Sequence, residues 1–128
     1  MRLLLDTHLL LWSVAASRKL APPTRRLIVD PRNEVFFSSA SIWEIAIKAA
    51  LGRDDFRIDL ERFLDELAVA AFIELPVEAI HAAAVPRLPD VHRDPFDRIL
   101  VAQAMTEPAI LLTNDAQLSG YGPFVRLV

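Results

Sequence analysis

Short apolar runs of strand type alternate with segments of helical spacing along this chain, and this alternation restricts its fold more than any other feature. The runs at 2–6, 34–39 and 109–113 are rich in branched and aromatic residues. Between them, apolar residues recur at three- and four-residue intervals, as at Ile42 and Ile45. Strands that alternate with helices favour a parallel sheet covered by helices on both faces.

Helical and strand patterns cover the rest of the chain as well. Strands are expected at 2–6, 34–39, 72–75, 109–113 and 124–128, and helices at 7–16, 22–30, 41–52, 59–71, 77–85 and 95–107. Pro76 is expected to open the fifth helix, and Gly52 suits the left-handed position just past the third. With 128 residues and no linker or repeat, the chain is expected to form a single domain, 1–128.

Composition excludes several classes of protein. A hydrophobic content of 53% and a positive mean hydropathy exclude a disordered chain. They also indicate apolar surface that a partner covers, so we expect self-association as a homodimer. The absence of cysteine rules out disulfides, a thiolate zinc site and a cysteine nucleophile, and it fits a reducing cytoplasm.

Neither a membrane segment nor a coat for nucleic acid is expected. The apolar run at 9–16 is too short to span a bilayer, and it follows an aspartate where a signal peptide has a basic leader. The formal net charge of -3 argues against nonspecific nucleic-acid binding, which depends on many basic contacts. It leaves open an enzyme that acts on a few nucleotides.

Five acidic residues stand beside the apolar runs, where strands end or helices begin. They are Asp6, Glu44, Asp94, Asp97 and Asp115. In parallel sheets, ligands bind outside the carboxyl ends of the strands, and several of these acids can converge there. Carboxylates held together repel one another unless a cation lies between them. The pattern therefore predicts a Mg²⁺ or Mn²⁺ site.

Helix capping offers a second explanation for three of these acids. Asp6 could cap the helix that follows the first strand. Ser41 and Glu44 have the spacing of a capping box. Asp115 could start a short terminal helix. These alternatives stay open at the level of the sequence.

The segment HRDPFDR contains two acids that compete for one role. Asp94 suits the N-cap of a helix whose first residue is Pro95, so we assign it the cap that aims Asp97 inward. Asp97 is then the preferred metal ligand, and Asp94 takes its place if that assignment is wrong.

Other polar residues are candidates with equally simple explanations. Thr7 and Thr113 could orient carboxylates or bind metal water, but local capping explains either. Arg93 and Arg98 are candidates for phosphate contact, although exposed arginine is common. His8 and His92 lack a recognisable ligand spacing, which disfavours a zinc site.

Aromatic residues are interpreted as core. The stripe formed by Trp43, Phe63 and Phe72 favours packing over base stacking.

Four segments taken together resemble, in order and spacing, the PIN-domain family, particularly its VapC-like toxin branch. They are LLLDTHLLLW, SSASIWEIAIK, HRDPFDRILVAQA and LLTND, and HRDPFDRILVAQA is the most specific. The resemblance implies a three-layer α/β/α sandwich with a central parallel sheet. It also implies a Mg²⁺-dependent endoribonuclease that is the toxin of a type II toxin–antitoxin pair, with a small antitoxin covering the active groove.

By this resemblance the metal-binding acids are Asp6, Glu44 and Asp97, with Asp115 as the fourth. His8 departs from the family, because many members have a small polar residue there. One or two Mg²⁺ ions would activate water and stabilise the attacked phosphate, and Mn²⁺ could substitute. Asp6 and Asp97 are the expected direct ligands, whereas Glu44 and Asp115 could bind a second metal or position the water.

Competing functions from other classes are less well supported. A receiver domain would need a lysine after a late strand, and a haloacid-dehalogenase-like phosphatase would need an aspartate where His8 stands. Three glycines, at positions 52, 120 and 122, do not form a phosphate-binding loop. A noncatalytic interaction module with an acidic rim and a housekeeping PIN nuclease without a toxin role remain as alternatives.

Overall fold

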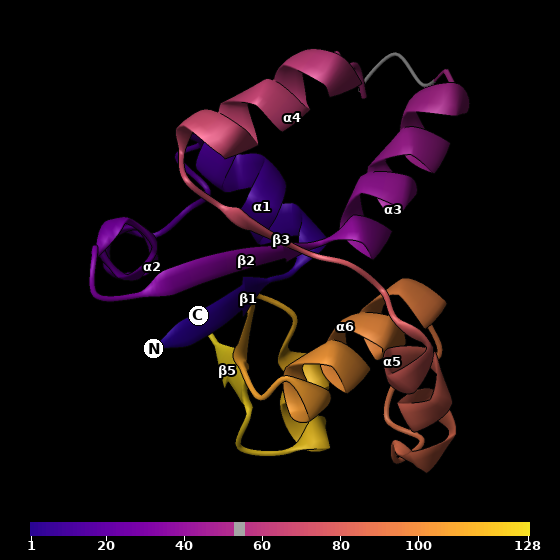
Figure 1. Ribbon diagram of the computed structural model, residues 1–128. Helices are drawn as coiled ribbons and strands as arrows, with labels where there is room; N and C mark the ends of the chain where they lie inside the picture. Colours follow the sequence, from indigo (N-terminus) through magenta and orange to yellow (C-terminus); the bar gives the residue numbers. More distant parts are fainter. Residues whose placement is uncertain (53–55) are drawn as a thin grey trace.

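Five short strands form one parallel sheet at the centre of the protein (Figure 1). A computed structural model describes residues 1–52 and 56–128. The strands are β1 (Arg2–Leu5), β2 (Glu34–Ser38), β3 (Ile73–Leu75), β4 (Ile110–Thr113) and β5 (Val125–Leu127). They lie in the order β3-β2-β1-β4-β5, and every neighbouring pair is parallel. The predicted parallel sheet is confirmed.

Helices cover both faces of this sheet, which gives the expected three layers (Figure 1). One face carries α1 (Thr7–Val14), α2 (Pro22–Val29), α3 (Ser39–Ala50) and α4 (Leu60–Val69). The other carries α5 (Ala79–Ala84) and α6 (Pro95–Thr106). Two 3-10 helices, η1 (Val85–Arg87) and η2 (Ala116–Tyr121), complete the described elements. No helix within 1–52 or 56–128 is long and apolar enough to cross a membrane.

The three leucines of the central strand β1, Leu3 to Leu5, are buried between the two helical layers. Leu3 and Leu5 point into the core shared with α1 to α4, whereas Leu4 points into the core shared with α5 and α6. All three side chains are fully buried. Because successive residues of a strand face opposite sides, a strand covered on both sides needs apolar residues at every position. Truncating one such leucine to alanine costs about 2–5 kcal/mol.

Element boundaries differ from the sequence predictions at several ends. The amphipathic helix expected at 59–71 spans the ten residues of α4. Pro76 does not open α5, which begins at Ala79, because the N–H of Glu78 donates to Nδ1 of His81 and defines the start there. Gly52 does adopt a positive φ of 66° just past α3, as expected.

The strand order creates a single point where the chain reverses its direction across the sheet. From β1 the chain proceeds to β2 and β3 on one side, and β4 and β5 lie on the other. The carboxyl ends of β1 and β4 therefore flank the crevice between two oppositely directed crossovers. In open parallel sheets, this crevice is where ligands bind.

Candidate functional site

Asp6 lies at the carboxyl end of β1, directly at this crevice. Its Oδ1 accepts a hydrogen bond from the N–H of Leu9 at 2.8 Å, and its Oδ2 accepts one from the hydroxyl of Thr113 at 2.6 Å. The side chain thus caps α1, as one alternative proposed, and also faces β4. Only 4% of the residue is exposed, and this burial raises the pKa of Asp6 against the opposing effect of both hydrogen bonds. A buried carboxylate of this kind favours a nearby cation.

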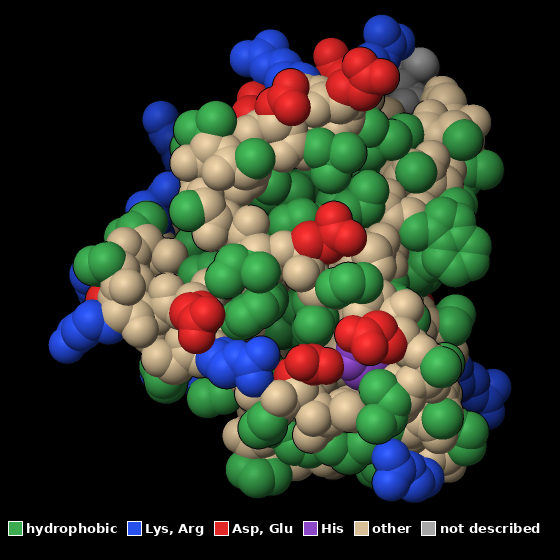
Figure 2. All heavy atoms as spheres, in the orientation of Figure 1, with side chains coloured by type: hydrophobic (Ala, Val, Ile, Leu, Met, Phe, Trp, Pro, Cys, Tyr) green, Lys and Arg blue, Asp and Glu red, His purple; other side chains and the backbone are tan. Residues whose placement is uncertain are grey.

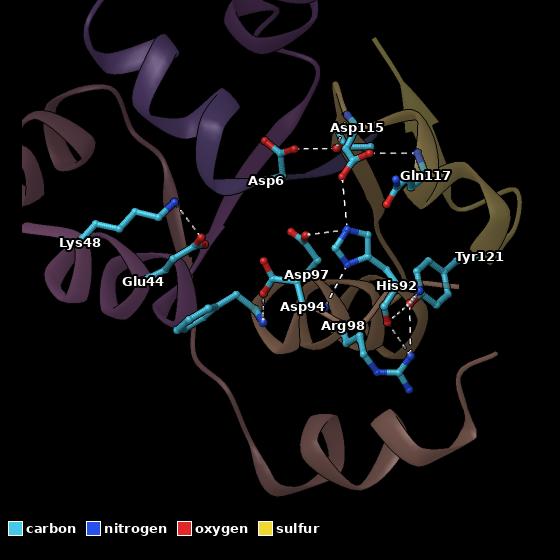
Figure 3. A network of polar contacts seen from close by, with 12 residues as sticks. Asp6, Glu44, Lys48, His92, Asp94, Asp97, Arg98, Asp115, Gln117 and Tyr121 are labelled. Carbon is cyan, nitrogen blue, oxygen red and sulfur yellow. Dashed lines mark hydrogen bonds and ion pairs between the residues drawn. The ribbon is translucent and has the colours of Figure 1, made fainter. Parts of the chain in front are cut away.

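Asp97 reaches the same crevice from the first turn of α6. Asp94 is the N-cap of this helix, because its Oδ1 accepts from the N–H of Phe96 at 2.9 Å. The pKa of Asp97 is raised to about 7, first by burial and then by the negative charge of Asp94, with smaller contributions from Glu44 and Asp6. These Coulomb effects indicate that acids from three elements lie near one another (Figure 3).

Glu44 is not part of a capping box, so that alternative is wrong. Strand β2 runs directly into α3, and Ser38 is the N-cap, accepting from the N–H of Ala40 at 3.0 Å. Ser41 therefore lies inside the helix, where its hydroxyl accepts from Thr7 at 2.9 Å. Glu44 projects from the second turn and pairs with Lys48 at 3.1 Å.

Thr113 and Asp115 bring the end of β4 into the site. Besides donating to Asp6, the Thr113 hydroxyl accepts from the N–H of Asp115 at 3.0 Å. Asp115 caps η2 by accepting from the N–H of Gln117 at 3.0 Å, so the predicted short helix exists as a 3-10 turn. The other oxygen of Asp115, Oδ2, faces the crevice (Figure 3).

His92 joins this group, although its spacing in the sequence gave no indication of it. Its Nε2 lies 3.8 Å from Oδ2 of Asp97 and 3.6 Å from Oδ2 of Asp115. These three residues offer ligand-type atoms that all lie within 4.8 Å of one another. A local pattern in the sequence could have indicated this position. A histidine two residues before an N-cap aspartate can accept a hydrogen bond from the backbone N–H of that aspartate, as His92 does from Asp94 at 3.0 Å.

Comparison with known proteins identifies the fold family. The model of a family described as PIN domain matches residues 3–122. The chain belongs to the PIN-domain family. A comparison with curated proteins found no match.

Two solved structures support this PIN fold. The VapBC2 structure from Rickettsia felis, bound to a DNA fragment from their promoter, has a similar chain at a TM-score of 0.71 and 15% identity, with 100% of this chain and 98% of that chain covered. A toxin–antitoxin complex from Klebsiella pneumoniae has one at a TM-score of 0.63 and 20% identity, with 96% and 94% covered. At these identities the likeness concerns the fold.

One of the two arginines expected to contact phosphate is held by contacts within the PIN domain. Arg98 was a candidate for phosphate contact, but its guanidinium is directed into the protein. It donates to the carbonyls of Val85, Pro89 and His92 at 3.1, 3.2 and 3.3 Å and to the hydroxyl of Tyr121 at 3.3 Å. Arg98 therefore fastens the segment between η1 and α6. Arg93 is exposed, and its contact with phosphate stays a prediction.

Trp43 does not pack in the core, so the prediction of one aromatic stripe is wrong for this residue. Phe63 and Phe72 belong to the core beneath α4, whereas Trp43 is 64% exposed on the PIN domain surface. Its ring makes an edge-to-face contact with Phe96 at 5.4 Å. A mostly apolar groove lined by Trp43 and Phe96 lies beside the acids.

The PIN site as a whole is an acidic crevice where the two helical layers meet. Figure 2, drawn in the orientation of Figure 1, shows acidic side chains together with a histidine on the face of the molecule that is turned to the viewer. Strand ends supply Asp6 and Thr113, and the turn after β4 supplies Asp115. The second turn of α3 supplies Glu44, and the first turn of α6 supplies Asp97. Such a set can hold a divalent cation through oxygen atoms.

Proposed function

We propose that this PIN domain is a Mg²⁺-dependent endoribonuclease that hydrolyses RNA phosphodiester bonds as the toxin of a toxin–antitoxin pair. The observation that carries the proposal is the convergence of Asp6, Glu44, Asp97 and Asp115 at the crevice between β1 and β4. In this arrangement the pKa of Asp97 is raised to about 7.

The donor atoms fit a hard divalent cation. Each acid contributes carboxylate oxygens, which Mg²⁺ and Mn²⁺ prefer to nitrogen or sulfur. Burial raises the pKa of both Asp6 and Asp97, so both carboxylates lack sufficient positive charge nearby. A bound cation would supply that charge. Lys48 is the basic side chain paired with Glu44, and it lies on the outer side of that carboxylate (Figure 3).

The residues divide into ligands and supports. Asp6 and Asp97 would hold a Mg²⁺ ion directly, and Glu44 and Asp115 would bind a second ion or position the attacking water. When bound, the cation lowers the pKa of that water and stabilises negative charge on the phosphate and the leaving oxygen. The Thr113 hydroxyl holds Asp6 in place, and Asp94 caps α6 so that Asp97 faces the crevice.

The toxin role rests on the structural relatives. Both are chains from toxin–antitoxin complexes, and each aligns over almost its whole length with this chain. We therefore propose a small antitoxin as a partner that covers the acidic crevice.

A homodimer is proposed from a separate feature of the surface. Trp43 and Ile47 on α3 and Leu51 at its C-cap recur every fourth residue, and each is substantially exposed. A second copy that covers this helix would remove these side chains from water. Sedimentation of the wild type and of Ile47→Glu tests this: the wild type should sediment as a dimer and the variant as a monomer, and a monomeric wild type contradicts it.

Cleavage assays test the nuclease proposal. Single-stranded and structured RNAs would be incubated with Mg²⁺, with Mn²⁺ and with a chelator. Asp6→Asn and Asp97→Asn should abolish cleavage. Asp59→Asn is the matched control, because Asp59 also caps a helix, α4, but lies outside the crevice. Cleavage that persists in the chelator and in Asp6→Asn would contradict the proposal and favour a noncatalytic module with a contaminating nuclease.

Expression in a bacterial host tests the toxin role. The wild type should arrest growth, Asp97→Asn should not, and the product of a neighbouring gene should restore growth. Harmless expression of a protein that cleaves RNA in vitro would favour a housekeeping nuclease.

A further inference from the structure

The ring of His92 is held in a defined orientation. The backbone N–H of Asp94 donates to Nδ1 of His92 at 3.0 Å. A backbone N–H is always a donor, so Nδ1 must be the unprotonated, accepting nitrogen. In the neutral ring the proton then lies on Nε2, the nitrogen that faces Asp97 and Asp115.

This tautomer decides what His92 can do in the acidic crevice. A histidine nitrogen coordinates a metal through its lone pair, and Nε2 has none available while it carries the proton. Nε2 therefore presents an N–H group to the two carboxylates. By distance alone His92, Asp97 and Asp115 resemble a set of three metal ligands, but the bond from Asp94 gives His92 a different role.

The backbone of His92 is fixed as firmly as its ring. The hydroxyl of Tyr121 accepts from the N–H of His92 at 3.0 Å and donates to its carbonyl at 3.3 Å. Arg98 donates to the same carbonyl and to the same hydroxyl. These contacts join the start of α6 to η2, the two elements that bear Asp97 and Asp115. The ring Nε2–H of His92 is thus held between the carboxylates of Asp97 and Asp115 (Figure 3).

We propose that His92 is a positioning residue of the nuclease site, which orients Asp97 and Asp115 through its Nε2–H and does not coordinate the cation. The inference rests on the proposed function, because it concerns the same metal site. At 3.8 and 3.6 Å both distances exceed the roughly 3.2 Å limit of an ordinary hydrogen bond, so the Nε2–H acts on the two carboxylates by electrostatic attraction and not through a formed hydrogen bond. This attraction favours the orientation in which Oδ2 of each acid faces His92, and it leaves the lone pairs of both carboxylates available for the cation.

The metal itself provides the first test. Mn²⁺ bound to the wild-type protein would be examined by electron spin-echo envelope modulation, which detects a directly coordinated imidazole nitrogen. The spectrum should lack that nitrogen coupling. A strong imidazole coupling in the wild type that disappears in a His92 variant would overturn the inference.

Affinity for Mn²⁺ provides the second test, by titration followed with electron paramagnetic resonance. His92→Leu removes the donor and should weaken binding about tenfold, the lower end of the range for residues that orient metal ligands. His92→Gln keeps an N–H near the position of Nε2 and should recover most of the affinity. Tyr121→Phe keeps the ring and its bond from Asp94 but loosens the backbone, so it should fall between them.

Three results separate this inference from the proposed function. Equal Mn²⁺ affinity in the wild type and in folded His92→Leu overturns the inference and leaves the nuclease proposal intact. Mn²⁺ binding that depends on His92 and shows no imidazole coupling, in a protein that cleaves no RNA, supports the inference and contradicts the nuclease proposal. If His92→Leu does not fold, the Mn²⁺ affinities of His92→Gln and Tyr121→Phe decide. A coordinating imidazole would be lost in His92→Gln and kept in Tyr121→Phe, so weaker binding in His92→Gln than in Tyr121→Phe would overturn the inference.

Discussion

The hydroxyl of Thr113 donates to Oδ2 of Asp6 at 2.6 Å, across the two strands that flank the crevice. Thr113 is fully buried, and its hydroxyl oxygen also accepts a hydrogen bond from the N–H of Asp115. One hydroxyl therefore holds two of the four acids, from the ends of β1 and β4.

Thr113→Val should disturb both the stability and the activity of the protein. Valine keeps the shape but removes the hydroxyl, which leaves a buried carboxylate oxygen and a backbone N–H without their partner. The free energy of unfolding should fall by about 1–3 kcal/mol, as measured by urea denaturation. RNA cleavage should fall as well, because Asp6 is then held only through Oδ1, by the N–H of Leu9, and Oδ2 loses its fixed position. Thr106→Val is the control, since Thr106 donates only within α6, to the carbonyl of Ala102, and should change neither quantity markedly.

The raised pKa of Asp97 predicts how stability depends on pH in the absence of metal. The folded pKa is about 7, above the usual value of 3.8, so the native state binds a proton that the unfolded state has already released. The free energy of unfolding should therefore decrease as pH rises through this interval and level off above about pH 7. Asp97→Asn removes this ionisation, so in a chelator its unfolding should change less with pH. Parallel curves for the two proteins would contradict the assigned pKa.

Metal binding should follow the same ionisation with the opposite sign. Below about pH 7 Asp97 carries a proton that a cation must displace, whereas above it the carboxylate is ready to bind. Mg²⁺ should raise the melting temperature more at about pH 8 than at about pH 5.5. Thermal unfolding with and without Mg²⁺ at both pH values measures this rise in melting temperature. Asp59→Asn should keep the rise, whereas Asp6→Asn should lose it. A shift independent of pH would place the cation elsewhere.

The fold was predictable because apolar residues repeat at different intervals in strands and in helices, and because β1 is buried on both faces. The convergence of Asp6 and Asp97 was predictable for a related reason. A helix that follows a parallel strand and a helix that precedes one both begin at the carboxyl edge of the sheet, as α1 and α6 do.

Features that depend on loops and exact boundaries were not predictable. The capping box at Ser41 failed because β2 continues into α3 without a loop, which moves the cap to Ser38. The role of Arg98 depends on carbonyls of Val85, Pro89 and His92, which local patterns do not bring together. The exposure of Trp43 follows from its place beside the stripe of Ile42 and Ile45 on α3.

Arg98 should be required for the structure of the site and not for contact with RNA. Arg98→Met removes donors to three backbone carbonyls and to Tyr121, so the free energy of unfolding should fall by about 1–3 kcal/mol. Arg98→Lys should restore little of it, since one ammonium cannot reproduce the geometry of a guanidinium. Urea denaturation measures both, and amide exchange at residues 88–94 should increase in both because His92 loses an anchor.

The adjacent Arg93 is the matched control for this prediction. Arg93 is exposed, so Arg93→Met should change the free energy of unfolding by less than about 0.5 kcal/mol. If Arg93 contacts phosphate, its loss should weaken RNA binding and reduce the dependence of that binding on salt. An Arg98→Met variant that is as stable as Arg93→Met but does not bind RNA would contradict the structural role of Arg98. It would mean that the Arg98 guanidinium leaves the backbone carbonyls and contacts the substrate.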